Sequence, residues 1–426
     1  MTIIEDLKGS RVLCFGISPC YNRQQFLKRL EEVGVDLTIL SFPGEKLLIR
    51  HPFKLVPVDE ETLDDTLSSL SKEMFDCAVT YSEFRIITLS ESTKRLSLRN
   101  QPLSQDAAEA SRDKGLMKRI FAAAGVPTAE FKLWSSQDEL EEALDALNLH
   151  NKDYILKPRL GTTSEGVYRA GVSTSIEKAI DEFYALCRKG AESRLYAPLL
   201  LPPPFLVERY IDRFGIPVEL AVEGYVSDGQ AHITMVSEKV DMVRSGLFLE
   251  NKYVSPPKST FVIEDLDKIC QIAKKAVKSL GITNSVYHLE MRYDDDDLKV
   301  LEIAARPGGG LISTSSKIRV GVDPLLQHLL LNLGRTPQQP VDTGVATCFG
   351  TLFYQNGFDV TKLGQVSDYL AQPERELFHE VRLDPETRKN PIQDWLVAFG
   401  VTGNSPQESY GHFYQTMDLI TARLRR

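Results

Sequence analysis

The segment from Val286 to Gly310, VYHLEMRYDDDDLKVLEIAARPGGG, constrains the fold more than any other part of this chain. Apolar side chains alternate with polar ones before and after a run of aspartates, and side chains of a strand point alternately to opposite faces. The segment therefore predicts two strands around an acidic turn. Their apolar faces coincide only if Glu290 and Glu302 share one face, and a one-residue slip in register would separate the two carboxylates.

This pairing of carboxylates predicts a metal site. A carboxylate set into an apolar strand is costly unless something pairs with it. Mg²⁺ is commonly held by one or two carboxylates together with phosphate oxygens. We therefore predict Glu290 and Glu302 as ligands of Mg²⁺, with Mn²⁺ as an alternative. Arg306 follows closely enough to meet the same anion, because a planar guanidinium suits phosphate or carboxylate.

Length and composition exclude several classes of protein. A chain of 426 residues is too long for one ordinary core, so we expect two to four domains. The net charge of −9 argues against a mainly electrostatic binder of nucleic acid or membranes. No apolar run approaches the roughly 20 residues of a membrane span, and the start lacks the apolar stretch of a secretory signal. We expect a cytoplasmic protein with reduced cysteines, since no CxxC pair is present.

The N-terminal part alternates strands and helices. We predict strands at Arg11–Ile17, Leu37–Ser41 and Cys77–Thr80, separated by helices at Arg23–Val33 and Leu63–Met74. This order predicts a parallel sheet with right-handed crossovers. The first turn lacks the GxGxxG fingerprint, so a nicotinamide dinucleotide site is not expected there.

The rest of the chain mixes helices and strands. A single helix is predicted over Asp106–Ala124, and the strand Asp153–Lys157 is predicted to enter a loop rich in glycine and hydroxyl residues. The tail from about Gln338 has its own predicted strand, Ala346–Tyr354, and terminal helix, His412–Leu424. It is therefore expected to be a separate small domain.

The loop after Lys157 has the composition of a phosphate-binding turn. Gly161 and Gly166 allow the backbone to fold tightly and to present N–H groups to an anion. Lys157 supplies a charge from the preceding strand, and hydroxyl donors come from Thr162, Thr163 and Ser164. The GK[ST] ending of a Walker A loop is absent, and a plain hairpin turn remains the alternative.

A second segment, Phe205–Ile211, is an apolar strand that carries Glu208. Such a segment can offer backbone groups to an adenine edge while aliphatic side chains enclose the ring. Taken alone, it fits an ordinary core strand better than an adenine site.

The order and spacing of these residues resemble the ATP-grasp superfamily over roughly residues 1–336. The residues concerned are Lys114, Lys157, Glu208, Glu219, Glu290, Glu302 and Arg306. The resemblance implies an α/β (α+β) ATP-grasp fold. It would comprise an N-terminal Rossmann-like parallel-sheet domain (1–105), an ATP-grasp domain (106–336, with a lid at roughly 128–210) and a small C-terminal α/β domain (337–426).

The resemblance also implies residue roles. Lys114 and Lys157 would hold the ATP phosphates, and Gly161–Gly166 would form a flexible loop over them. The adenine hinge would be Glu208, Arg209, Tyr210 and Ile211, and Glu219 would contact the ribose. Arg306 would steady acyl-phosphate and tetrahedral intermediates. Ala304 replaces an asparagine common in the superfamily, and Glu302-Ile-Ala-Ala-Arg306 is similar to the E-x-A-A-R of the L-amino-acid (dipeptide) ligase branch.

The implied activity is that of an ADP-forming carboxylate–amine ligase that joins small molecules, amino acids or their analogues, with ATP and Mg²⁺. Arg306, Lys157 and His288 are the predicted catalytic residues. His288 would contact substrate or help the amine to lose a proton, and a structural histidine is the alternative. A carboxylase-like or purine-pathway ligase and a non-catalytic ATP-binding scaffold remain as other functions. No nucleic acid or membrane partner is expected, and homodimerisation is left open.

Overall fold

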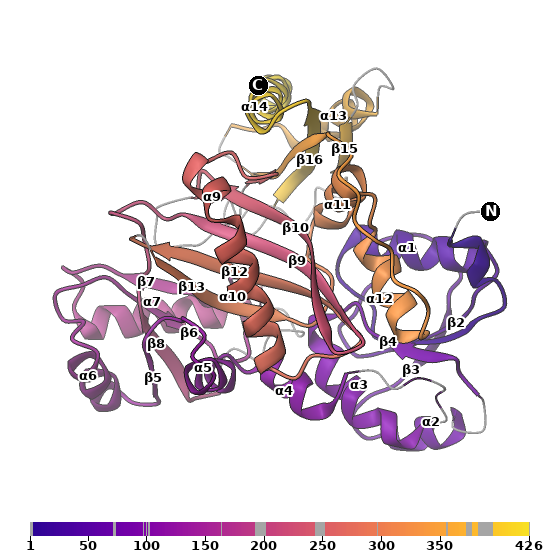
Figure 1. Cartoon of the computed structure of the whole chain (residues 1–426), viewed down its shortest axis with the longest axis horizontal. Helices are drawn as coiled ribbons and strands as arrows, with labels where there is room; N and C mark the ends of the chain where they lie inside the picture. Colours follow the sequence, from indigo (N-terminus) through magenta and orange to yellow (C-terminus); the bar gives the residue numbers. More distant parts are fainter. Residues whose placement is uncertain are drawn as a thin grey trace.

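The computed structural model describes residues 3–70, 74–96, 98, 100, 103–162, 164–191, 202–242, 252–295, 297–354, 357–371, 377–381 and 395–425. Within these ranges the strands form three sheets: a parallel N-terminal sheet, a four-stranded antiparallel sheet and an eight-stranded antiparallel sheet (Figure 1). The predicted α/β class is therefore confirmed. None of the described helices combines the length and the apolar character needed to cross a membrane.

The N-terminal sheet has the strand order β3-β2-β1-β4, and all its pairings are parallel, as predicted. Its strands are β1 (Arg11–Phe15), β2 (Asp36–Ser41), β3 (Lys54–Pro57) and β4 (Cys77–Val79). The helices of this region are α1 (Tyr21–Glu32), α2 (Leu63–Leu70) and α3 (Ile86–Ser92). Short 3₁₀ turns lie at Glu5–Leu7, Glu83–Arg85 and Thr93–Arg95.

A helix from far along the chain completes the core of this sheet. In α12 (Pro324–Asn332), Leu325 and Leu329 are buried in the same cluster as Val12 and Ile39 of the sheet. Figure 1 shows α12 beside β4 and α1. The burial of these leucines fixes the N-terminal sheet against the body of the molecule, because apolar burial is the main favourable contribution to packing.

The prediction of a single helix over Asp106–Ala124 is wrong. The structure has two helices, α4 (Gln105–Arg112) and α5 (Lys114–Ala123), with extended backbone at Asp113 between them. The Asp113 carboxylate accepts hydrogen bonds from the backbone N–H groups of Gly115 (2.9 Å) and Leu116 (3.1 Å). Aspartate is a favoured N-cap residue, and this local capping overrides the continuous helical pattern.

The four-stranded antiparallel sheet lies within the range predicted for a lid. Its strand order is β5-β8-β6-β7 and its core includes the rings of Trp134, Phe183 and Phe205. The elements are β5 (Phe131–Trp134), α6 (Gln137–Ala146), β6 (Tyr154–Lys157), β7 (Tyr168–Ala170), α7 (Ile176–Ala191) and β8 (Phe205–Arg209). We call it the lid sheet below.

The eight-stranded sheet forms the centre of the molecule, with the order β13-β12-β9-β10-β11-β14-β16-β15. Helix α10 (Leu266–Ser279) crosses one face of it (Figure 1). Its first strands are β9 (Glu219–Ser227), β10 (Gln230–Val240), β11 (Lys252–Ser255), β12 (Val286–Asp294) and β13 (Asp297–Ala304). The short helix α9 (Thr260–Glu264) precedes α10, and α11 (Ile312–Val320) follows β13.

The tail contributes three strands to this same sheet. Strand β14 (Ala346–Phe353) pairs with β11, so the backbone ladder continues across the boundary predicted at residue 337. The remaining elements are a 3₁₀ turn (Val360–Lys362), α13 (Leu363–Leu370), β15 (Leu377–Val381), β16 (Trp395–Gly403) and α14 (Pro406–Leu424). The domain boundaries themselves stay predictions.

The break between α4 and α5 leads to a stability prediction. Replacing Asp113 with alanine removes both capping hydrogen bonds, so we expect the free energy of unfolding to fall by roughly 1 kcal/mol. Chemical denaturation followed by circular dichroism measures this change. The matched control is Asp181→Ala, at an exposed position inside α7. An equal loss of stability in both variants would contradict a capping role.

Candidate active site

A cavity, partly open to solvent, lies between the lid sheet and the eight-stranded sheet. Most of the residues predicted to bind ATP and metal line it. These are Lys114, Lys157, Gly161, Thr162, Ser164, Glu208, Arg209, Ile211, Glu219, Glu290 and Glu302. Gly166, Tyr210, His288 and Arg306 are not among the lining residues, and Thr163 lies outside the described residues.

The predicted hairpin and its register are present. Strands β12 and β13 are antiparallel, and Glu290 is the direct partner of Glu302, so both side chains lie on one face. The ladder shifts register immediately after Glu290, at a bulge. The two carboxylates therefore reach the same cavity from adjacent strands.

The donor chemistry of this pair fits a hard cation such as Mg²⁺. Among the described residues, no group of three or more His, Cys, Asp or Glu side chains forms a more complete metal site. Glu290 and Glu302 would hold the ion, and phosphate or water oxygens would supply the remaining ligands. Their assignment as metal ligands remains a prediction.

Lys114 joins the two walls of the cavity. Its ammonium group lies 3.0 Å from the Glu302 carboxylate and donates a 2.6 Å hydrogen bond to the carbonyl of Gly161. The interruption between helices α4 and α5 at Asp113 positions Lys114, because it places this residue in the first turn of α5. The Glu302 pKa is lowered: burial alone would raise it, but Lys114 and Lys157 more than compensate.

Two cations that were not predicted pair with Glu219, and one of them also pairs with Glu290. Lys239 of β10 lies 2.6 Å from Glu219 and also forms a close ion pair with Glu290. Arg292 of β12 lies 2.6 Å from the second oxygen of Glu219. Both cations are buried. Their only sequence signal is a charge inside an apolar strand, the same signal that identified Glu290.

The predicted adenine hinge is only partly arranged as expected. Arg209 and Ile211 line the cavity, and Arg209 is held by an ion pair with Asp294 of the acidic turn. Tyr210 instead packs against the guanidinium of Arg169, 3.8 Å from the ring centre. Asp294 of the acidic turn therefore helps to place a residue of the cavity wall.

The loop from Gly161 to Gly166 is held at its start by hydrogen bonds from two helices. The carbonyl of Leu160 accepts a 2.8 Å hydrogen bond from Arg112, and Lys114 holds Gly161. Gly166 is buried with φ of +74°, and a Cβ there would lie 2.7 Å from Pro158. A β-branched residue at Gly166 would therefore be strained.

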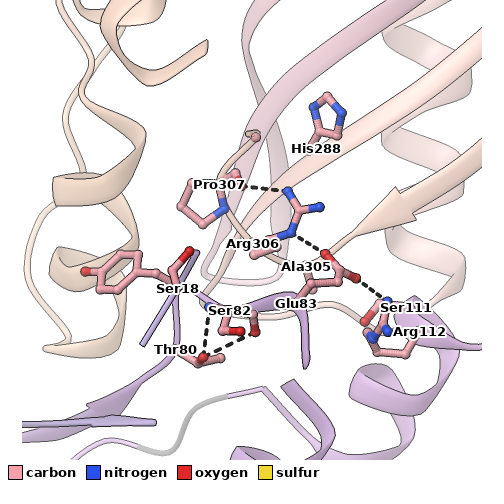
Figure 2. Close-up of polar contacts among 12 residues, drawn as sticks. Ser18, Thr80, Ser82, Glu83, Ser111, Arg112, His288, Ala305, Arg306 and Pro307 are labelled. Atoms are coloured by element: carbon pink, nitrogen blue, oxygen red, sulfur yellow. Dashed lines mark hydrogen bonds and ion pairs between the residues drawn. The ribbon is translucent and has the colours of Figure 1, made fainter. Parts of the chain in front are cut away.

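Arg306 lies in a neighbouring group of buried charges (Figure 2). It forms an ion pair with Glu83, whose other oxygen accepts a 2.6 Å hydrogen bond from Arg112. Burial alone would raise the pKa of Glu83, but Arg306 and Arg112 hold it at about 2. Glu83 was not predicted, because it comes from the N-terminal region and carries no motif of its own.

His288 lies between two carboxylates. Its Nδ1 atom is 2.5 Å from Glu223 and its Nε2 atom is 3.2 Å from Glu290. Burial would lower the pKa of His288, but Glu223 and Glu290 raise it to about 10. In this arrangement the ring donates to both neighbours, which matches the structural alternative more closely than the proton-accepting one. Its catalytic assignment remains a prediction.

The comparisons with known proteins agree with this geometry. Residues 150–315 match the family model described as the ATP-grasp domain. This segment of the chain is therefore similar to the ATP-grasp family. The chain is 26% identical to alanine–anticapsin ligase of Bacillus subtilis (strain 168) over 307 residues, which cover 67% of this chain and 62% of that relative. The chain thus matches less than two thirds of that relative's length.

Solved structures show the same fold at lower identity. The L-amino acid ligase from Bacillus licheniformis has a TM-score of 0.78 at 19% identity, covering 96% of this chain and 97% of that one. An N5-carboxyaminoimidazole synthase from Aspergillus clavatus, solved with ADP and 5-aminoimidazole ribonucleotide, has a TM-score of 0.72 at 16% identity, with coverages of 97% and 99%. The ATP-grasp fold is thus confirmed.

The register of β12 and β13 gives a binding prediction. In the Glu302→Gln variant we expect Mg²⁺ to lose most of its effect on ADP affinity, because a neutral amide is a weaker ligand for a hard cation than a carboxylate. ADP binding measured by calorimetry with Mg²⁺ and with EDTA gives this difference. Glu264→Gln, an exposed change on α9, is the control. A folded Glu302→Gln variant with the wild-type Mg²⁺ effect would remove Glu302 from the metal site.

Proposed function

We propose that this protein is an ATP-dependent ligase that joins a carboxylate to an amine through an acyl phosphate. One observation carries the proposal. The carboxylate pair Glu290 and Glu302 faces the same cavity as Lys114 and Lys157, and Arg306 follows four residues after Glu302. This arrangement offers a cation site, two phosphate-binding charges and a guanidinium for the reacting centre.

The first step transfers the γ-phosphoryl group to the acid. A carboxylate oxygen of the substrate attacks the γ-phosphorus of ATP, the bond to the bridging oxygen of ADP breaks, and an acyl phosphate forms. Lys114 and Lys157 would orient the phosphates. Mg²⁺ held by Glu290 and Glu302 would neutralise charge on the phosphate oxygens. Most of the rate enhancement would come from positioning and charge compensation.

The second step forms the amide. The amine nitrogen attacks the acyl carbon, the resulting tetrahedral centre carries a negative oxygen, and phosphate then leaves while the nitrogen loses a proton. Arg306 would stabilise the negative oxygen, and its ion pair with Glu83 would hold the guanidinium in a fixed direction. The lid sheet would keep water from the acyl phosphate, which would otherwise hydrolyse.

We further propose amino acids or their analogues as the substrates. The similarity to alanine–anticapsin ligase and the Glu302-Ile-Ala-Ala-Arg306 sequence support this choice. Phosphate release measured against pairs of amino acids, with mass spectrometry of the products, tests it directly. Turnover that depends on bicarbonate and an aminoimidazole ribonucleotide would instead place the protein with the purine-pathway type, whose fold it also shares.

The acyl-phosphate route predicts the nucleotide product. With a productive acid and amine, we expect one ADP and one phosphate for each amide formed, because the bond broken is the one to the γ-phosphorus. Ion-exchange chromatography of the nucleotides, compared with the amide yield, measures the ratio. Omitting the amine is the control for unproductive ATP hydrolysis. AMP formed in equal amount to the amide would contradict the mechanism.

A further inference from the structure

A lysine that was not among the predicted site residues lies behind the side chains that line the cavity. Lys118 projects from α5, and its side chain has an exposed fraction of 0%. Its ammonium group is 2.8 Å from one oxygen of Glu208 and 3.1 Å from the hydroxyl of Thr128. Lys118 does not line the cavity, so it cannot itself meet the phosphates of a bound nucleotide.

The same carboxylate binds a second lysine. Lys157, which does line the cavity, lies 2.5 Å from the other oxygen of Glu208. Burial would raise the pKa of Glu208, but Lys118 and Lys157 hold it at about 2, so the carboxylate is charged at neutral pH. One negative charge therefore faces two positive ones. If only one of these lysines were present, the buried carboxylate would neutralise the charge of that lysine.

We propose that Lys118 is a positioning residue, which neutralises Glu208 and thereby leaves the charge of Lys157 available to nucleotide phosphates. The inference rests on the proposed function of the cavity as an ATP site. Lys118 acts through Glu208 and does not touch the ligand. Of the two lysines that pair with Glu208, Lys157 is the one that lines the cavity, so its charge contributes directly to binding.

Lys118 also connects the two walls of the cavity. The Thr128 hydroxyl that it contacts donates a 2.8 Å hydrogen bond to the carbonyl of Val300. Val300 lies on β13, two residues before Glu302, whereas Glu208 lies on β8 of the lid sheet. Lys118 therefore ties the strand of a predicted metal ligand to the carboxylate that holds Lys157.

The test compares ADP with adenosine, because only ADP carries phosphates. In the Lys118→Met variant, Glu208 would neutralise Lys157, so we expect ADP affinity to fall about tenfold or more. Adenosine affinity should stay within about twofold of wild type. Calorimetry in the presence of Mg²⁺ measures both, and Arg119→Met, an exposed change at the next position of α5, is the matched control. Equal losses for both ligands would mean that Lys118 only supports the local structure, and would overturn the proposal.

A second substitution separates charge from packing. Because Glu208 itself lines the cavity, the Glu208→Gln variant is the reference: the double variant with Lys118→Met should bind ADP within about twofold of it, since no carboxylate remains to capture Lys157. This double variant also carries the test if Lys118→Met alone does not fold, since it leaves no buried unpaired carboxylate. A further loss of ADP affinity of about tenfold when Lys118→Met is added to the folded Glu208→Gln variant would overturn the proposal.

The wild-type protein distinguishes this inference from the proposed function. If wild type binds neither ADP nor ATP, the proposed function falls, and the inference falls with it. If wild type binds ADP and Lys118→Met binds it equally well, only the role of Lys118 is overturned.

Discussion

The register between β12 and β13 is the constraint on which the site depends. Glu290 and Glu302 reach one cavity only because they are direct partners in an antiparallel ladder. A shift by one residue would turn one carboxylate into the apolar core beneath the sheet. That core, which includes Leu289, Met291 and Ile303, holds the register in turn, since the same slip would bring these side chains to the polar face.

Around this pair, three carboxylates of the site each meet a cation from another element. Glu302 meets Lys114 of α5, Glu219 meets Lys239 of β10, and Glu208 meets two lysines. Ions removed from water are tolerated only when such partners compensate for the lost hydration. The arrangement also keeps several lysines and arginines in place at the cavity wall, where a polyanionic ligand can exchange for the carboxylates.

Sequence patterns predicted the residues that lie on one strand or beside a motif, and missed those that depend on tertiary proximity. Glu290, Glu302 and Lys157 could be found because a charged residue within an otherwise apolar strand is conspicuous in the sequence. Lys239 has the same signal, but nothing in the local sequence indicates that it reaches Glu290 from β10. Glu83 lies 223 residues from Arg306, so only the folded chain brings them together.

The error in the helix prediction has a local origin. The helix over Asp106–Ala124 was predicted as continuous because both halves are good helix formers, yet the capping of α5 by Asp113 ends the first half. The separate tail domain stays a prediction, made because the tail has its own strand and terminal helix; the ladder between β11 and β14 exists only in the folded sheet, so no local pattern indicates it.

Shared fold alone does not determine which acid and amine the proposed ligase would join. The same architecture accompanies an L-amino acid ligase and an N5-carboxyaminoimidazole synthase at comparably low identity, so the shared sheets cannot encode the acceptor. The parts that can encode it are the groups around Arg306, where Glu83 of the N-terminal region, Arg112 of α4 and the loop after β13 meet. Because Glu83 binds both arginines, the N-terminal sheet is positioned to set the direction of the guanidinium. In the proposed reaction, the packing of α12 on that sheet would matter as well, since it fixes the region that carries Glu83 against the body of the molecule.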